Sequence, residues 1–368
     1  MSRDRDTILQ FGTGRFLRAF VDLFVQEVNE AGAIWDVVCV QSTGAERAAQ
    51  LNAGPFHVAI RGMSAGAMID ETRSISSVSR GLAADRDWET VRSLAQRDCL
   101  KIVVSNTTEA GLSLDPADTE RSGVPRSFPA KLLDLLLQRM ETDAQPLTIL
   151  PCELVDGNAD VLRALVLEQA CKWGVDASTR ARLEEENVWC NTLVDRIVSA
   201  PTEDHPLRNS DPLLAVAEPF AFWAIVAPGK KPIDHPSIQV VDSVTPYALR
   251  KVRLLNGAHT ALVERALGRF ATVREAMADP STREWLHTLV FEELVPCIDA
   301  RVEDADGFAK SVFERFDNPF LDHRLEDIAL HQSDKVGVRL LPTYHEYLST
   351  FDRVPKLLGD TVEPYLRS

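Results

Sequence analysis

ILQFGTGRFLRAF, from Ile8 to Phe20, is the stretch that decides the fold. The apolar run before Gly12 is typical of a strand and the residues after Gly14 are typical of a helix, so both glycines lie in a strand-to-helix turn. In a dinucleotide-binding fold the first glycine permits the tight turn, and the second lets a pyrophosphate approach the backbone. Leu17 stands where the full motif has a third glycine, and the turn alone fits a plain connection equally well.

The segments around this turn predict a parallel sheet. Four runs are apolar almost throughout, as strands buried on both faces of a parallel sheet are, and helical periodicity at residues 15–32 and 87–98 separates them. The pattern predicts an α/β fold with a Rossmann-like doubly wound sheet in residues 1–242, followed by a mostly α-helical domain in residues 243–368. The four predicted strands are Thr7–Phe11, Trp35–Gln41, Cys99–Asn106 and Leu147–Glu153.

The composition narrows the classes of partner. The chain carries 55 acidic and 40 basic residues, a net charge of −15, which disfavours nucleic acid and anionic membranes as partners. None of its six cysteines forms a CxxC pair, no leader-like segment opens the sequence, and no apolar run is long enough to span a membrane, so we expect a cytoplasmic protein with reduced thiols. Its eight histidines lack HxH and HExxH spacing, so no metal site is expected.

A second polar pattern lies on a predicted helix in residues 249–266, LRKVRLLNGAHTALVERA. At about 100° per residue, Lys251, Asn256 and His259 fall near 0°, 140° and 80°, so they share one side of the helix and can converge on one small ligand. Judged by spacing alone, a solvated Lys251 and a helix interrupted at Asn256 and Gly257 is the more common arrangement.

A third polar cluster, Glu153, Asp156 and Asn158, follows the predicted strand at residues 147–153. Ligands of open α/β sheets bind outside the carboxyl ends of the strands, so this loop is well placed to face a substrate. An ordinary helix N-cap by Asn158 or Asp160 explains the same residues equally well.

The end of the second predicted strand bears on the choice of cofactor. NAD-binding folds often place a carboxylate there for the ribose hydroxyls, whereas this strand ends in Gln41, Ser42 and Thr43. Gln41 can still bond a ribose hydroxyl, but it does not repel a 2′-phosphate, and Arg47 lies nearby. We therefore expect NAD, and NADP is not excluded.

Seven segments in order together resemble the polyol-specific long-chain dehydrogenase/reductase family, which includes the mannitol dehydrogenases. The Lys-x4-Asn-x2-His pattern is the most specific of the matches, and SNTTEAG, PCELVDGN and LNGAHT are most similar to the tagaturonate reductase (altronate oxidoreductase) branch. The segments are FGTGRFLRAF, VVSNTTEAG, SFPAK, PCELVDGNADVL, NTLVDRIV, EPFAFW and KVRLLNGAHTAL.

This resemblance implies an NAD(H)-dependent dehydrogenase that interconverts a sugar-acid ketone and its alcohol. Lys251 would be the general acid/base, Asn256 and Asn158 would bond the reacting oxygen, and His259 would orient a neighbouring hydroxyl. Glu153, Lys335 and Arg339 would contact the substrate, the last two through its carboxylate. The expected cofactor-binding residues are Gly12, Thr13, Gly14, Arg15, Phe16, Gln41, Ser42, Asn106 and Thr107.

Two alternatives remain at this point. The same chemistry could act on mannitol, fructuronate or another polyol, and a protein of a different class, a non-catalytic dinucleotide-binding regulator, could keep the fold.

Oxidation through Lys251 requires the lysine amine to be neutral. Nearby positive charge favours the neutral amine, and Arg250 and Arg253 are the candidates for that charge.

Overall fold

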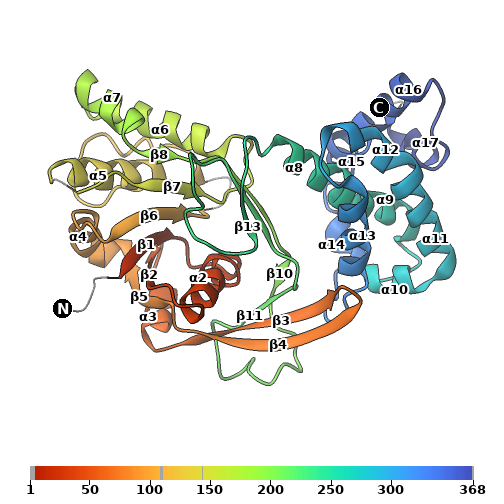
Figure 1. Cartoon of the computed structure of the whole chain (residues 1–368), viewed down its shortest axis with the longest axis horizontal. Helices are drawn as coiled ribbons and strands as arrows, with labels where there is room; N and C mark the ends of the chain where they lie inside the picture. Colours follow the sequence, from red (N-terminus) through yellow and green to blue (C-terminus); the bar gives the residue numbers. More distant parts are fainter. Residues whose placement is uncertain (1–4, 108–110, 143, 367–368) are drawn as a thin grey trace. The chain divides into compact units, whose positions relative to one another are not determined.

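The computed structural model describes residues 5–107, 111–142 and 144–366, and the chain forms two compact units (Figure 1). We call them the N-terminal unit and the C-terminal unit. The C-terminal unit includes two short segments from earlier in the chain, because it comprises Ile60–Asp70, Glu218–Phe220 and Thr245–Ser368. The N-terminal unit comprises Met1–Ala59, Glu71–Ala217 and Ala221–Val244.

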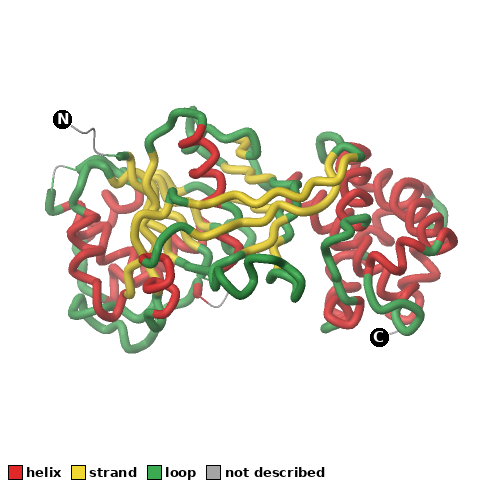
Figure 2. Tube along the Cα trace, turned by 90° about the horizontal axis from the view of Figure 1, so that it is seen from below, coloured by secondary structure: helices red, strands yellow, loops and turns green. Residues whose placement is uncertain are grey.

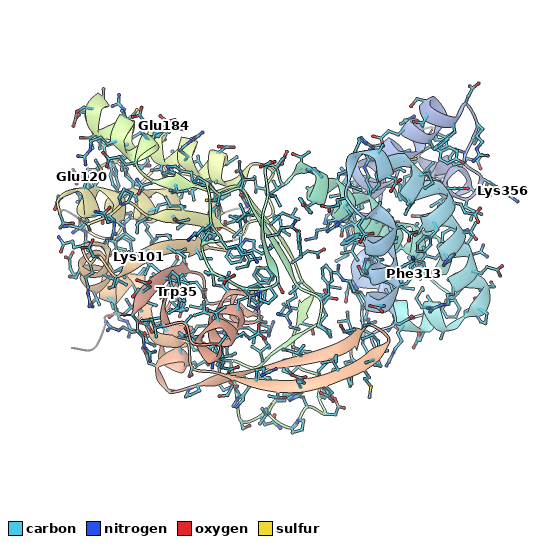
Figure 3. The ribbon with its side chains drawn as sticks, in the orientation of Figure 1. Trp35, Lys101, Glu120, Glu184, Phe313 and Lys356 are labelled. Atoms are coloured by element: carbon cyan, nitrogen blue, oxygen red, sulfur yellow. The ribbon has the colours of Figure 1, made fainter. Side chains whose placement is uncertain are left out.

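A six-stranded sheet in the order β5-β2-β1-β6-β7-β8 forms the centre of the N-terminal unit. Every neighbouring pair is parallel, and the strand order reverses between β1 and β6, as in a Rossmann fold. The predicted fold class is therefore confirmed, and the four predicted strands are β1, β2, β6 and β7. The bounds are β1 (Asp6–Phe11), β2 (Trp35–Gln41, beginning at the Trp35 labelled in Figure 3), β5 (Val78–Ala83), β6 (Leu100–Ser105), β7 (Thr148–Pro151) and β8 (Val188–Trp189).

Helices cover both faces of this sheet. Leu9 and Phe11 of β1 pack into one apolar core with α4 (Ala84–Ala95), α5 (Phe128–Met140), α6 (Asn158–Lys172) and α7 (Ala177–Glu185). Side chains alternate between the faces of a strand, so Gln10 points the other way, toward Cys39 of β2 and Asp22 of α2 (Val21–Glu30). The remaining helix beside the sheet, α3 (Glu46–Asn52), packs on β5.

The helix predicted over residues 15–32 is in fact two, α1 (Arg15–Arg18) and α2. The break falls at Ala19 and Phe20, where Phe20 has φ −127° and ψ −83°. The carbonyl oxygen of Ala19 accepts a hydrogen bond at 3.0 Å from Nη1 of the buried Arg196. A side chain 177 positions away thus takes a carbonyl that a continuous helix would use, which no local periodicity reveals.

Two smaller sheets contain strands that are not among the four predicted ones. One has the order β10-β11-β3-β4, and its β3 and β4 form a long hairpin whose outer strand is almost fully exposed. The other has the order β13-β12-β9. The bounds are β3 (Phe56–Ser64), β4 (Ala67–Ile75), β9 (Thr192–Asp195), β10 (Val198–Ser199), β11 (Ala215–Ala217), β12 (Phe222–Ile225) and β13 (Ile238–Val240).

The C-terminal unit is mostly helical (Figure 2), as predicted, and an apolar core formed by its helices includes Phe313 (labelled in Figure 3). Two of its segments are π-helices, which widen the turn locally. The elements are α8 (Thr245–Arg250), π-helix η2 (Lys251–Asn256), α9 (Gly257–Ala266), α10 (Val273–Ala278), α11 (Pro280–Thr288), π-helix η3 (Leu289–Leu294), α12 (Val295–Ile298), 3-10 helix η4 (Asp299–Arg301), α13 (Ala305–Phe316), α14 (Leu325–Ala329), α15 (Gln332–Arg339), α16 (Leu341–Phe351), α17 (Lys356–Val362) and 3-10 helix η5 (Glu363–Tyr365).

Candidate active site

The two glycines of the turn after β1 have different surroundings. Gly12 has φ +125°, and a Cβ there would lie 2.9 Å from the carbonyl oxygen of Asn106, so the turn requires glycine. Its N–H donates to the carbonyl oxygen of Val40 at 3.1 Å. A Cβ on Gly14 would meet no atom within 4 Å. The turn therefore leaves open space beside Gly14 at the carboxyl edge of the sheet, where α/β sheets bind ligands.

The other predicted residues of this turn differ in exposure. Thr13 and Phe16 are half-buried and Arg15 is exposed. The ring of Phe16 stacks on Phe20, with centroids 4.9 Å apart. The carbonyl oxygen of Thr13 accepts a hydrogen bond from the buried Arg18, so a side chain in the protein interior holds the backbone of the turn in place.

Side chains at the ends of β2 and β6 form hydrogen bonds with nearby backbone groups. The Gln41 amide donates to the carbonyl oxygen of Thr43 at 2.7 Å and accepts from the Ala48 N–H of α3 at 2.9 Å, and Ser42 is exposed. Nδ2 of Asn106 donates to the carbonyl oxygen of Cys152 at 2.8 Å. No carboxylate stands at the end of β2 to repel a 2′-phosphate, so charge at this position does not discriminate between NAD and NADP.

Glu153 is 2% exposed and connects the ends of β6 and β7. One carboxylate oxygen accepts from the N–H and hydroxyl of Thr107 at 2.8 and 3.0 Å, and the other accepts from the Ser105 hydroxyl at 3.0 Å. Three hydrogen bonds compensate the burial of this charge. The carboxylate thus fixes Thr107 beside the turn, and its contact with a substrate stays a prediction.

Asn158 is 1% exposed, and both polar atoms of its side-chain amide form hydrogen bonds with backbone groups. Nδ2 lies 3.0–3.1 Å from the carbonyl oxygens of Pro151, Glu153 and Thr192, and Oδ1 accepts from the Thr192 N–H at 3.0 Å. Two amide hydrogens are thus shared among three acceptors. The alternative that Asn158 caps α6 is wrong, because the helix begins at this residue and Asn191 accepts from its first N–H groups.

The segment that carries Lys251 departs from a regular α-helix. α8, η2 and α9 follow one another without a break, and η2 is a π-helix from Lys251 to Asn256. The i→i+5 hydrogen bonding of a π-helix puts more residues in each turn than an α-helix has, so Asn256 lies closer in angle to Lys251 than the about 140° expected for an α-helix. Both side chains are half-buried, and the Asn256 amide bonds no described residue. The π turn thus narrows the face that these residues share.

His259 follows on α9 and is 7% exposed. Its Nδ1 lies 3.0 Å from the carbonyl oxygen of Leu255, which only accepts, so Nδ1 carries the proton. Burial, and then the nearby His323, hold the pKa of His259 well below its usual range. The ring is therefore neutral at physiological pH, with its other nitrogen, Nε2, an acceptor.

Helix α15 packs on α9 and adds two cations. Nη1 of Arg339 donates to the Thr260 hydroxyl at 3.2 Å, and Nζ of Lys335 donates to the carbonyl oxygen of Ile328 at 2.6 Å. Burial lowers the pKa of both, and Arg339 further lowers the pKa of Lys335. Within residues 5–107, 111–142 and 144–366, neither cation pairs with a carboxylate.

His323 is a member of this cluster that the sequence did not single out. Its ring lies edge-on to His259, with centroids 5.0 Å apart, and burial lowers the pKa of His323 as well. A single histidine in NPFLDHRLEDI carries no local signal of this proximity. The C-terminal unit thus gathers Arg339, Lys335 and two neutral histidines beside the π turn.

The arginines that flank Lys251 in sequence are bound to other helices. The guanidinium of Arg250 lies 4.4 Å from the ring centroid of Phe308, and its Nη1 donates to the carbonyl oxygen of Glu303. Arg253 is buried, where it donates to the Thr343 hydroxyl at 2.8 Å and to Glu346 at 3.3 Å. Because Glu346 balances its charge, Arg253 is a poor source of positive potential for Lys251.

Across the part of the chain that the structure describes, no three His, Cys, Asp or Glu side chains group as metal ligands would. All six cysteines are free thiols, three of them buried. No helix in the same ranges combines the length and apolar character needed to cross a bilayer.

Asp22 of α2 is fully buried, and burial raises its pKa from 3.8 to about 7 against the opposing charge of Arg18. Between these values the folded chain holds a proton that the unfolded chain releases. The contribution of Asp22 to stability is therefore present below its unfolded pKa and lost as the pH rises through its folded pKa.

We expect Asp22→Asn to remove this pH dependence. Wild-type protein should lose up to about 1.4 kcal/mol per pH unit relative to the variant within that window. Urea denaturation of both proteins at several pH values from 5 to 8, followed by tryptophan fluorescence, measures the difference. Parallel stability curves would show that Asp22 does not titrate there.

Comparison with known proteins supports the predicted resemblance. The family model for the mannitol dehydrogenase Rossmann domain matches residues 6–238, and the model for the mannitol dehydrogenase C-terminal domain matches residues 243–362. The altronate oxidoreductase of Halalkalibacterium halodurans is 36% identical over 373 residues, covering 96% of this chain and 73% of that protein. The altronate oxidoreductase of Bacillus subtilis is 34% identical, covering 96% and 77%.

Solved structures share the fold. D-sorbitol dehydrogenase in substrate-free form superposes with a TM-score of 0.87 at 23% identity, covering 98% of this chain and 79% of that one. Pseudomonas fluorescens mannitol 2-dehydrogenase, in a ternary complex with NAD and D-mannitol, has a TM-score of 0.76 at 23% identity, covering 99% and 79%. The chain therefore belongs to the mannitol dehydrogenase family and is an oxidoreductase that acts on the CH–OH group of a sugar acid or polyol.

Proposed function

We propose that this protein interconverts a sugar-acid ketone and its alcohol, of the tagaturonate/altronate type, with NAD(H) as cofactor and Lys251 as acid/base. The altronate oxidoreductases that cover 96% of the chain support the sugar-acid class. Mannitol, fructuronate and other polyols are the alternative substrates within the same family.

One observation carries the choice of a sugar acid, namely two cations that lack a carboxylate partner among the described residues. Lys335 and Arg339 are held by a carbonyl and a hydroxyl oxygen, and burial lowers the pKa of each. Desolvated cations without a counter-charge are costly, and a bound carboxylate would offset that cost. A neutral polyol offers no such compensation.

The turn after β1 fits a dinucleotide. The space beside Gly14 would admit a pyrophosphate, the tight turn requires Gly12, and the exposed Ser42, directly after β2, would be accessible to a ribose. Nicotinamide, when bound, supplies or accepts the hydride at the substrate carbon. Because the end of β2 carries no carboxylate, NAD is proposed on the family's precedent, a ternary complex of one member with NAD.

The chemistry assigned to the C-terminal unit follows from its residue types. In the reduction direction the carbonyl oxygen gains negative charge, which the Lys251 ammonium neutralises by donating a proton. The Asn256 amide, which bonds no described residue, would donate a hydrogen bond to the same oxygen. Nε2 of neutral His259 would accept a hydrogen bond from a neighbouring hydroxyl and so orient the substrate. Oxidation reverses the proton transfer.

We assign Glu153 and Asn158 a supporting part in this scheme. Both are nearly fully buried, and backbone or hydroxyl groups already occupy their polar atoms. To bond a substrate oxygen, Asn158 would have to release one of three carbonyl oxygens. We infer that these two side chains chiefly fix the loops after β6 and β7.

A substrate panel tests the proposal. Tagaturonate, fructuronate and fructose are offered with NADH or NADPH, and altronate, mannonate and mannitol with the oxidised cofactors, while absorbance of the reduced cofactor is followed. We expect the highest kcat/KM for a sugar acid with NAD(H). Turnover of neutral polyols alone would contradict the sugar-acid assignment, and a preference for NADPH would contradict the cofactor.

Lys335→Gln sharpens the same test. The variant should raise KM for a sugar acid by about tenfold, because one ionic hydrogen bond to the carboxylate is lost, and leave KM for a neutral polyol unchanged. Lys310→Gln, which removes an exposed lysine of the same unit, is the matched control.

A further inference from the structure

Arg18 is a buried cation that the proposed chemistry does not use. It is 1% exposed at the end of α1. Nη1 donates to the carbonyl oxygen of Thr13 at 2.5 Å, and Nε donates to the carbonyl oxygen of Leu213 at 3.0 Å. One planar guanidinium therefore ties the glycine turn to a segment 195 residues away.

The bond to Thr13 sets the direction of the next N–H group. A trans peptide is planar, with its C=O and N–H pointing in opposite directions. Because Arg18 draws the Thr13 oxygen inward, the N–H of Gly14, in the same peptide unit, points away from Arg18. The space beside Gly14 is open. The positive charge behind this peptide also polarises it, which makes the N–H a stronger donor.

We propose that Arg18 is a positioning residue for the cofactor: it holds the Thr13–Gly14 peptide so that the Gly14 N–H donates to the dinucleotide pyrophosphate. This inference rests on the proposed function, because it presumes a bound dinucleotide. Arg18 itself touches no ligand and acts only through the peptide.

The charges around Arg18 support an anionic ligand at this turn. Burial, and then the positive charges of Arg47 and Arg15, lower the pKa of Arg18 to about 10, against the attraction of Asp22. Three arginines thus influence one turn in a chain whose net charge is −15. A local positive potential of this kind attracts a pyrophosphate.

Packing alone does not account for this arginine. Nη2 of Arg18 and both carboxylate oxygens of Asp22 are buried without a hydrogen-bond partner among the described residues. Leaving buried polar atoms unpaired is costly, and an apolar side chain of similar size would avoid that cost. Arg139 provides the contrast, because it is equally buried but donates to four backbone carbonyl oxygens.

Arg18→Met and Arg18→Lys test the inference. Methionine keeps the stem and removes the donors and the charge, whereas lysine keeps the charge but not the two-carbonyl fork. We expect the Kd for NADH, measured by fluorescence titration, to rise about 10- to 100-fold in the methionine variant and less in the lysine variant. The Kd for ADP-ribose, which retains the pyrophosphate, should rise by the same factor. The kcat at saturating NADH should change little.

Arg139→Met is the matched control for general damage. Its guanidinium bonds backbone near the amino-terminal end of β6, at the opposite edge of the sheet from the turn. The Arg139→Met substitution should lower the melting temperature and leave the Kd of the folded protein for NADH unchanged. Unaltered Kd in both folded Arg18 variants, or an equal loss in Arg139→Met, overturns the inference. If the wild-type chain binds neither NADH nor ADP-ribose, the proposed function itself fails.

Discussion

Replacing Lys251 with alanine is expected to lower kcat by about 10²- to 10⁴-fold while NADH still binds. The substrate oxygen gains or loses a proton as hydride is transferred, and Lys251 is the amine proposed to exchange it. Steady-state assays give kcat, and NADH fluorescence titration gives the Kd. Added methylamine should restore part of the activity by standing in for the missing amine.

Lys310→Ala provides the control for the change of charge. Lys310 is a lysine of the same unit that is 70% exposed and paired with Asp306 at 2.7 Å, so its loss should leave kcat unchanged. A Lys251→Ala protein with wild-type kcat would sink the proposed acid/base role. Loss of NADH binding together with activity would instead mean that the substitution damages the fold.

Gly12→Ala is expected to abolish measurable cofactor binding and to destabilise the N-terminal unit by several kcal/mol. A non-glycine residue at φ +125° costs about 1–3 kcal/mol, and the new Cβ would also lie 2.9 Å from the Asn106 carbonyl oxygen. To relieve that overlap, the turn must separate from the end of β6. Thermal unfolding and NADH titration measure the two effects.

Gly14→Ala separates the ligand site from the fold. With φ −68° and no atom within 4 Å of its Cβ, alanine should fit here without loss of stability. Its methyl group would nevertheless occupy space assigned to the pyrophosphate, so NADH should bind more weakly. Normal NADH binding by both glycine variants would refute a cofactor site at this turn.

Several features of the fold were predictable because their signals are local. β1, β2, β6 and β7 are continuous apolar runs, which is what burial on both faces of a parallel sheet requires. The β3–β4 hairpin was missed for the opposite reason. Its outer strand, AMIDETRSI, is mostly polar and exposed, so it carries no apolar alternation.

Most residues of the candidate site could be predicted from the sequence, but their arrangement in space could not. The sequence places Lys251, Asn256 and His259 on one helix, but the π turn that brings Asn256 closer in angle to Lys251 leaves no periodic signature. His323 joins His259 only because the helices of the C-terminal unit fold on one another. Arg250 and Arg253 lie near Lys251 in sequence but bind other helices.

The sequence by itself determined the parallel sheet, the glycine turn, the helical second unit and the family, because periodicity, glycine positions and ordered motifs are properties of neighbouring residues. Only the tertiary structure decided which partners the buried polar side chains bond. Asn158 bonds the backbone of two separate segments, residues 151–153 and Thr192, and Arg18 reaches Leu213. Within the part of the chain that the structure describes, Lys335 and Arg339 bond a carbonyl and a hydroxyl oxygen and no carboxylate. The physical reason is that a buried polar group takes its partners from whichever chain segments pack around it, however distant in sequence.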